Sequence, residues 1–177
     1  MASILNSTLI WRGNKYQIKY IDANTFDDLP YDRCQQVYGV CFYKDKMVIV
    51  KGESGSEEKG WGLVGGHIEN GETFEETLTR EVQEETNMKV LKSTPIGYQK
   101  VVSPNSSIDY QLRYCAIVEP IRKFQKDPAG SVEEIKLIDP ENYKNYFDWG
   151  EIGDRIIERA LHIKKTTFLV KRKSTKK

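Results

Sequence analysis

The chain has 177 residues, 38% of them hydrophobic, which suits one globular domain with a buried core. Charged residues make up 30% but nearly cancel to a net charge of +1, so no global attraction to nucleic acid or to a membrane surface is expected. The three cysteines are far apart, and their spacing indicates neither a disulfide framework nor a zinc site.

The chain contains no apolar stretch long enough to span a bilayer and no basic region followed by an apolar run at its start. We therefore expect a soluble, cytoplasmic protein. We expect a single domain over residues 1–170, in which residues 1–34 form an N-terminal hairpin extension. The Lys- and Arg-rich residues 171–177 are predicted to be a flexible tail, with no role in binding nucleic acid.

The first half of the chain reads as strands leading into a helix. Two short strands are predicted to meet at a turn on Gly13-Asn14. Residues 35–43 and 46–50 are predicted to be paired strands, and a polar, glycine-bearing loop follows. A helix is predicted to begin near Thr73, because Thr73 and Glu76 have the spacing of a capping box.

In the second half of the chain, the sequence pattern predicts three further strands and a terminal helix. The strand candidates are residues 89–102, 110–120 and 133–139. Residues 149–165 form an amphipathic pattern whose apolar side carries Ile152, Ile156, Ile157 and Ala160. Strands around one internal and one terminal helix favour a mixed α/β sandwich, whose strand order the pattern leaves open.

The internal helix, residues 74–86, separates its glutamates into two groups. At about 100° per residue, Phe74, Leu78 and Val82 form a buried stripe, whereas Glu75 and Glu76 point to solvent. A second group of three glutamates falls on or beside the stripe near the negative end of the helix dipole, where carboxylates repel one another. These are Glu81, Glu84 and Glu85.

Two explanations compete for this acidic group. A helix stabilised by surface ion pairs is the common one, but Arg80 is the only basic residue in the helix to offset the three carboxylates. A divalent cation offsets them more fully, since Mg²⁺ takes oxygen ligands and also binds substrate phosphates. We therefore interpret Glu81, Glu84 and Glu85 as a metal site, with Mn²⁺ as an alternative to Mg²⁺.

The same residues resemble the signature of the Nudix hydrolase family, of the MutT-like kind. The segment from Gly66 to Met88 follows the pattern G-x5-E-x7-R-E-V-x-E-E-x-N-M, against the family's G-x5-E-x7-R-E-U-x-E-E-x-G-U with U a bulky aliphatic residue. Asn87 replaces the last glycine, and asparagine is the residue that best tolerates a left-handed helix cap. The resemblance implies the family's α-β-α sandwich with a mixed central sheet.

The resemblance also implies a reaction and residue roles. Family members hydrolyse a nucleoside diphosphate linked to another group, with Mg²⁺ neutralising the diphosphate and activating the attacking water. Carried over by position, Glu81, Glu84 and Glu85 resemble metal ligands, and the Gly66 carbonyl a further one. Glu72 and Arg80 resemble a pair that braces the loop against the helix.

Other roles remain open on the sequence. The general base is one of the helix glutamates or a later acid, for which Glu133 and Glu134 are the best candidates; a charged strand end explains either one equally well. Trp61 and Tyr110, among several aromatic residues, are candidates to stack on a base. His67 is a candidate phosphate contact, although packing on the loop explains it as well.

The substrate is expected to be a small-molecule nucleotide, and a nucleoside triphosphate yielding a monophosphate and pyrophosphate is preferred. Cleavage of ADP-ribose or a nucleotide sugar is the alternative, because Pro104 lies at a distance beyond the box found in some relatives with that activity. An alternative of another class is a Nudix module that binds a nucleotide or protein without hydrolysis. A monomer and a homodimer are both compatible with the sequence.

Overall fold

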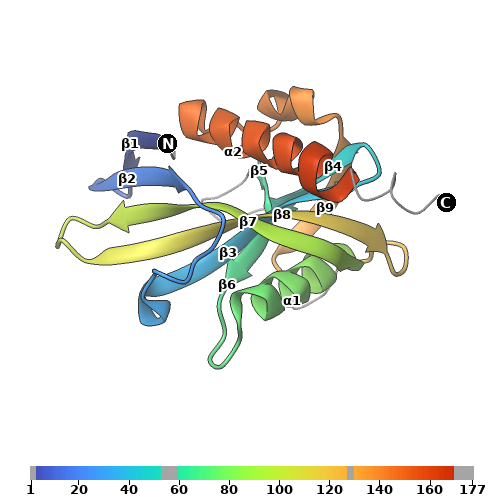
Figure 1. Cartoon of the computed structure of the whole chain (residues 1–177), viewed down its shortest axis with the longest axis horizontal. Coiled ribbons are helices and arrows are strands. Elements are labelled where there is room, and N and C mark those ends of the chain that lie inside the picture. Colours follow the sequence, from blue (N-terminus) through green and yellow to red (C-terminus); the bar gives the residue numbers. More distant parts are fainter. Residues whose placement is uncertain (1–2, 53–59, 127–129, 170–177) are drawn as a thin grey trace.

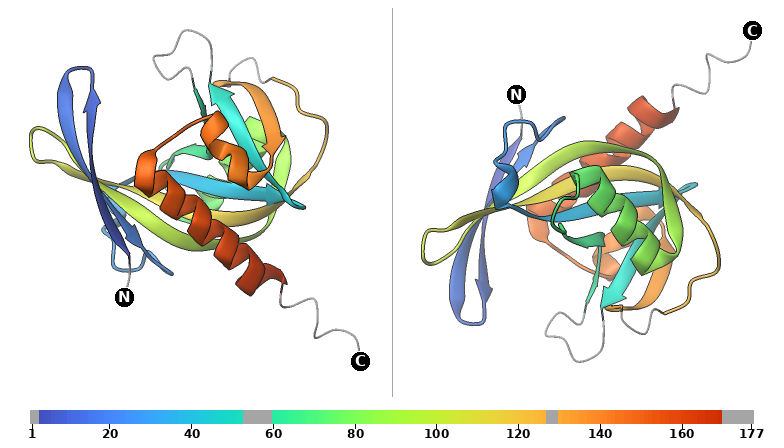
Figure 2. Two further views of the ribbon diagram at one scale, coloured as in Figure 1. Left: turned by 90° about the horizontal axis from the view of Figure 1, so that it is seen from above. Right: turned by 90° about the horizontal axis from the view of Figure 1, so that it is seen from below.

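The computed structural model describes residues 3–52, 60–126 and 130–169. Within these residues, nine strands form one sheet, and the two α-helices lie on its opposite faces (Figure 1). The two turned views show α2 crossing one face and α1 lying on the other (Figure 2). This arrangement confirms the predicted α-β-α sandwich. The tail predicted for residues 171–177 lies outside the described residues.

The elements agree with the expected order. The strands are β1 (Ile4–Trp11), β2 (Asn14–Asp22), β3 (Cys34–Tyr43), β4 (Lys46–Gly52), β5 (Trp61–Gly62), β6 (Val64–His67), β7 (Met88–Val102), β8 (Ile108–Pro120) and β9 (Val132–Ile138). The helices are α1 (Phe74–Thr86) and α2 (Gly150–Ile163), with short helical turns at η1 (Tyr31–Arg33), η2 (Pro140–Asn145) and η3 (Lys164–Leu169).

The sheet is mixed. Its main path runs β1-β2-β7-β8-β3-β4-β5, while β6 pairs with β3 and β9 pairs with β4. The β3/β8 pair is parallel and the other pairs are antiparallel. Because β2 pairs with β7 from Gln17↔Val102 to Asp22↔Gly97, the N-terminal hairpin extends the central sheet.

The hairpin turn lies one residue earlier than the sequence predicted. Arg12 and Gly13, at φ 48° and 74°, form the two-residue loop, and Asn14 already begins β2. Positive φ at both positions is the requirement of a type I′ turn, whose twist matches that of the flanking strands. The prediction of Gly13-Asn14 was therefore wrong by one position.

Each face of the sheet carries its own core. On one face, Ile152, Ile156, Ile157 and Ala160 of α2 pack against buried strand residues, which confirms the predicted apolar side. On the other face, Leu78 and Val82 of α1 pack against a second cluster. All three cysteines are free and buried, and Cys41 and Cys115 are core residues as expected. No helix among the described residues is long and apolar enough to cross a membrane.

Candidate active site

Helix α1 is fixed at both ends by the residues that the sequence marked. The Thr73 side chain accepts a hydrogen bond from the Glu76 N–H, and the Glu76 carboxylate accepts one from the Thr73 N–H, which confirms the capping box. At the other end Asn87 adopts φ 56°, the left-handed conformation, and its N–H donates to the Gln83 carbonyl. The helix therefore holds its glutamates at a defined rotation against the sheet.

Glu72 and Arg80 join the preceding loop to the helix. Arg80 Nε lies 2.6 Å from Glu72 Oε1 and Nη2 lies 3.0 Å from Oε2. The same Nη2 donates to the His67 carbonyl at 2.9 Å. The Thr77 hydroxyl also donates to Glu72, at 2.8 Å. The Arg80 hydrogen bonds hold the pKa of the Glu72 carboxyl down at about 2, so this ion pair persists far below neutral pH.

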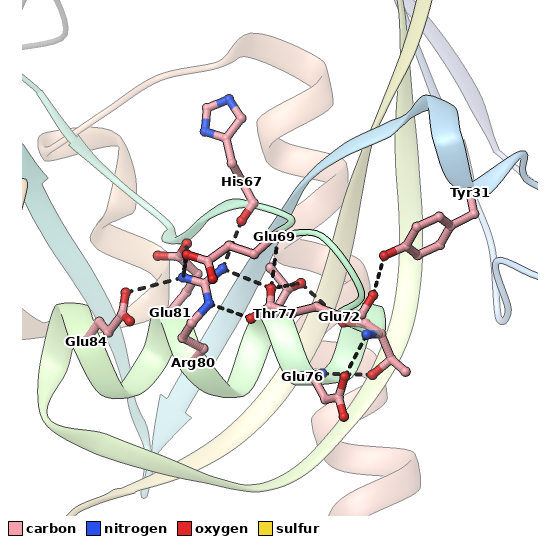
Figure 3. A network of polar contacts seen from close by, with 10 residues as sticks. Tyr31, His67, Glu69, Glu72, Glu76, Thr77, Arg80, Glu81 and Glu84 are labelled. Atoms are coloured by element: carbon pink, nitrogen blue, oxygen red, sulfur yellow. Dashed lines mark hydrogen bonds and ion pairs between the residues drawn. The ribbon is translucent and has the colours of Figure 1, made fainter.

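Arg80 also contacts two of the three glutamates expected to bind metal (Figure 3). Its Nη1 lies 2.9 Å from Glu81 Oε1 and 3.3 Å from Glu84 Oε2. Glu81 is half-buried and Glu84 is exposed, which follows their positions beside and outside the apolar stripe. Burial raises the pKa of Glu81, while Arg80 lowers it.

Glu85 is the most strongly desolvated carboxylate of the group. Its Oε2 accepts a hydrogen bond from the Gly65 N–H at 2.9 Å, and no cationic side chain in the described part of the chain pairs with it. Burial raises the pKa of Glu85 to about 8, opposed by the Gly65 N–H and reinforced by Glu81 and Glu84. A charged Glu85 is therefore costly in the protein alone.

Gly66 lies directly against Glu81. A Cβ added at Gly66 would stand 2.5 Å from Glu81 Oε1 and 3.0 Å from Oε2, so a glycine is what allows the loop to approach the helix. This approach brings main chain of β6 beside the carboxylates of α1. The possible ligands on this side of the helix are carboxylate and main-chain carbonyl oxygens, which are the hard ligands that Mg²⁺ and Mn²⁺ prefer.

The carboxylates do not converge on one point in the geometry seen here. Among the described residues, no three His, Cys, Asp or Glu side chains are arranged to hold an ion. The reason is visible in the contacts: Arg80 draws Glu81 and Glu84 toward itself, whereas Glu85 turns to Gly65. For Glu81, Glu84 and Glu85 to bind one cation together, their side chains would have to rotate away from these contacts.

Most of the sequence matches a known domain family. The family described as NUDIX domain matches residues 34–160, which is well over half of the chain. The chain belongs to the Nudix hydrolase family. The match includes the complete loop and helix described above, and it begins after the β1–β2 hairpin.

Individual Nudix proteins support this membership. The chain is 31% identical over 113 residues to a protein of Bacillus subtilis named putative 8-oxo-dGTP diphosphatase YtkD, covering 61% of this chain and 68% of that protein. The crystal structure of the B. subtilis pyrophosphohydrolase BsRppH has a TM-score of 0.64 at 21% identity, covering 88% of this chain and 96% of that one. A NUDIX hydrolase from Nitrosomonas europaea has a TM-score of 0.56 at 18% identity, covering 73% and 88%. The two structures show the shared fold.

Glu134 and Trp61 lie apart from the Nudix helix. Both are paired with Lys51, Glu134 from β9 and Trp61 from β5, so the three side chains share one face of the sheet. Trp61 packs on the α2 side, where its ring centroid lies 5.7 Å from that of Tyr146. Glu134 lies 4.0 Å from Lys136 and is half exposed. The sheet thus separates Glu134 from the α1 carboxylates, which does not favour a role as general base.

His67 and Tyr110 occupy different surroundings. The His67 ring projects from β6 away from α1, while its carbonyl accepts from Arg80 (Figure 3). Its Nε2 lies 3.3 Å from Gln36 Nε2. Tyr110 packs on Tyr98 at 5.8 Å between ring centroids and lines a shallow hollow with Arg33 and the β7–β8 loop.

A set of polar residues on the central strands of this Nudix fold was not predicted from the sequence. They share the face that carries the His67 ring. The available signal was the appearance of polar residues two apart within otherwise apolar strands, which marks a common side of a sheet. These residues are Gln36, Tyr38, Gln99, Gln111 and Arg113.

Proposed function

We propose that this Nudix hydrolase cleaves a nucleoside triphosphate between its α- and β-phosphates with Mg²⁺, releasing a nucleoside monophosphate and pyrophosphate. The observation that carries the proposal is the close approach of Gly66 to Glu81, with Glu84 and Glu85 on the same side of α1. Nudix hydrolases generally use divalent metals. The naming of a similar protein as an 8-oxo-dGTP diphosphatase supports the triphosphate.

In this proposal, some residues of the chain bind the metal ion and others position them. Glu81, Glu84 and Glu85, with the Gly66 carbonyl, would hold Mg²⁺, which would neutralise the phosphate oxygens and make a water molecule more acidic. Arg80 and Glu72 keep the loop at the helix through the contacts already described. They position the ligands and need not touch the substrate.

The reaction is a hydrolysis of a phosphoric anhydride. The water oxygen forms a bond to one phosphorus atom, and the bridging oxygen leaves with the electron pair of the broken bond. A carboxylate of the group takes the proton of the water.

The test is product analysis over a panel of nucleotides. Purified protein is incubated with Mg²⁺ and, separately, with nucleoside triphosphates, ADP-ribose and dinucleoside polyphosphates. We expect monophosphate and pyrophosphate from a triphosphate and none with EDTA. In Glu84→Gln, which removes an exposed charge, we expect kcat/KM to fall by roughly 100-fold.

Glu151→Gln is the matched control, since it removes one exposed charge in the first turn of α2, on the other face of the sheet. It should keep the wild-type rate. If ADP-ribose were cleaved faster than any nucleoside triphosphate, the proposed substrate would be ADP-ribose and not a triphosphate. If wild type and Glu84→Gln were equally inert on the entire panel, the hydrolase proposal would fail and a binding module would remain.

A further inference from the structure

Three glutamine side chains lie in one row across the central sheet. Gln36 of β3 is opposite Gln111 of β8, and Gln111 is opposite Gln99 of β7. His67 of β6 continues the row, because it is opposite Gln36. Directly paired residues share a face of a sheet. We call Gln36, Gln99 and Gln111 the amide strip.

The amide strip lies on the α2 side of the sheet. Gln36 and Tyr38 are two residues apart on β3 and therefore share a face, and Tyr38 packs against the core under α2. The His67 ring at the end of the row points away from α1 (Figure 3). Since Gly66 faces Glu81 and His67 faces the strip, β6 stands between the candidate phosphate site and the amides.

Arg113 lies beside the strip and is buried, with 4% of its surface exposed. It is opposite Tyr38, and its guanidinium carbon stands 4.8 Å from the Tyr38 ring centroid. Nη2 donates to Gln99 Oε1 at 2.6 Å and to Gln111 Oε1 at 3.1 Å, and Nη1 donates to the Leu112 carbonyl at 3.2 Å. Within the described residues no carboxylate pairs with it, and its buried Nε has no hydrogen-bond partner.

This contact fixes which way two of the amides point. A guanidinium has only hydrogen-bond donors, so Gln99 and Gln111 must both turn their oxygen atoms toward Arg113. Their NH₂ groups are then committed to the other side, and neither donates to another group among the described residues. The buried positive charge adds to the same effect, because it favours electron-rich atoms nearby. The strip thus presents donors and a positive field.

Exposure decreases along the row from β6 inward. His67 is exposed, Gln36 and Gln111 are half-buried, and Gln99 is 8% exposed. If the phosphates of a nucleotide bind on the α1 side of β6, its base would extend past β6 and reach the exposed His67 before the half-buried Gln111.

We propose that the amide strip, oriented by Arg113, reads the base of the nucleotide and selects guanine-type bases. This inference rests on the proposed function, since it assigns the base of the same substrate. Guanine displays two neighbouring acceptors, O6 and N7, on one edge. Adenine displays a donor, N6–H₂, beside N7, and cytosine displays a donor at N4. A donor facing the strip NH₂ groups would leave both unpaired, which is unfavourable in a partly buried site.

The experiment replaces a strip donor with an acceptor of the same shape. In Gln111→Glu, one carboxylate oxygen still accepts from Arg113, but the other faces the base. We expect wild type to prefer GTP over ATP in kcat/KM, and the ratio to fall by roughly 10-fold or more in the variant. Equilibrium binding of GMP and AMP in EDTA, measured by calorimetry, should change in the same direction without catalysis.

Gln36→Glu, at the more exposed end of the strip, is the second variant and applies if Gln111→Glu does not fold. Gln17→Glu is the matched control, because it adds the same charge in β2, where Gln17 Oε1 accepts from the Thr8 hydroxyl away from the strip. The control should keep the wild-type ratio.

The outcomes separate the two proposals. Hydrolysis of GTP and ATP at equal kcat/KM, or an unchanged ratio in both strip variants, overturns the role of the strip and leaves the hydrolase standing. Preferential binding of GMP that is lost in the strip variants, without hydrolysis of any nucleotide, supports the strip and contradicts the proposed function. Absence of both binding and hydrolysis rejects both.

Discussion

At the scale of single residues, Gly66 shows how a missing side chain shapes the site. The space for a Cβ is already taken by the Glu81 carboxylate, 2.5 Å away. Neither the main-chain conformation nor a turn requires glycine there, because Gly66 is not among the positive-φ residues. The requirement comes from the neighbour, and it connects β6 to the chemistry of α1.

Gly66→Ala should therefore reduce activity more than stability. The added methyl group displaces the Glu81 carboxylate, and a displacement near 1 Å at a catalytic group costs roughly 100-fold in rate. We expect kcat/KM for the cleaved nucleotide to fall by about that factor. Gly60→Ala is the control, because no atom of the described residues lies within 4 Å of a Cβ there. Equal activity of both variants would show that Glu81 is not held by this approach.

Glu72 gives a prediction about stability and pH. Its pKa is lowered from 4.5 to about 2, chiefly by Arg80, so the folded state favours the charged form. The ion pair thus contributes stability that is present above pH 4.5 and is lost as the pH falls toward 2. In EDTA, Glu72→Gln should be less stable than wild type at pH 7, and the gap should close between pH 4.5 and 2.

Denaturant unfolding at several pH values measures this gap. Glu151→Gln, at an exposed position of α2, should show a small and nearly constant difference over the same range. A gap for Glu72→Gln that stays constant down to pH 2 would contradict a charge-based contribution.

At the scale of elements, the helix cap and the apolar stripe could be predicted from the sequence, but the register between strands could not. The capping box at Thr73 and the apolar stripe of α1 are contained in a short window, and the sequence predicted both. The hairpin turn was placed one residue late because Arg12 is not a residue that marks a positive φ. The row of Gln36, Gln111 and Gln99 joins three strands that are distant in sequence, so only the pairing of β3, β8 and β7 reveals it.

Register also decides the prediction for Glu134. Its partner Lys51 places it on the Trp61 face of the sheet, away from α1. Glu134→Gln should therefore change kcat/KM by less than about threefold, as for a surface substitution. A larger loss, together with loss of the acidic limb of the pH–rate profile, would instead identify Glu134 as the general base that the sequence suggested.

At the scale of the whole molecule, the N-terminal hairpin contributes a buried residue to the core although the family match begins at residue 34. Tyr20 of β2 is fully buried. Asp22, at the end of β2, joins the hairpin to α2: its Oδ2 lies 2.5 Å from Arg155 Nη2, and both of its carboxylate oxygens lie 3.2 Å from Arg155 Nε. The Asp22 side chain is 7% exposed, so this pair is shielded from solvent.

Asp22→Asn should consequently destabilise the entire protein and not the hairpin alone. It removes the charge from several hydrogen bonds to Arg155, for which about 1–3 kcal/mol of unfolding free energy is expected. Glu119→Gln breaks the exposed pair with Lys89 and should cost less than about 1 kcal/mol. Hydrogen exchange distinguishes the two kinds of unfolding. If the hairpin folds with the core, the slowest amides of β2 and of β8 lose protection equally in Asp22→Asn; if only β1 and β2 lose it, the hairpin is a separate unit resting on a complete Nudix domain.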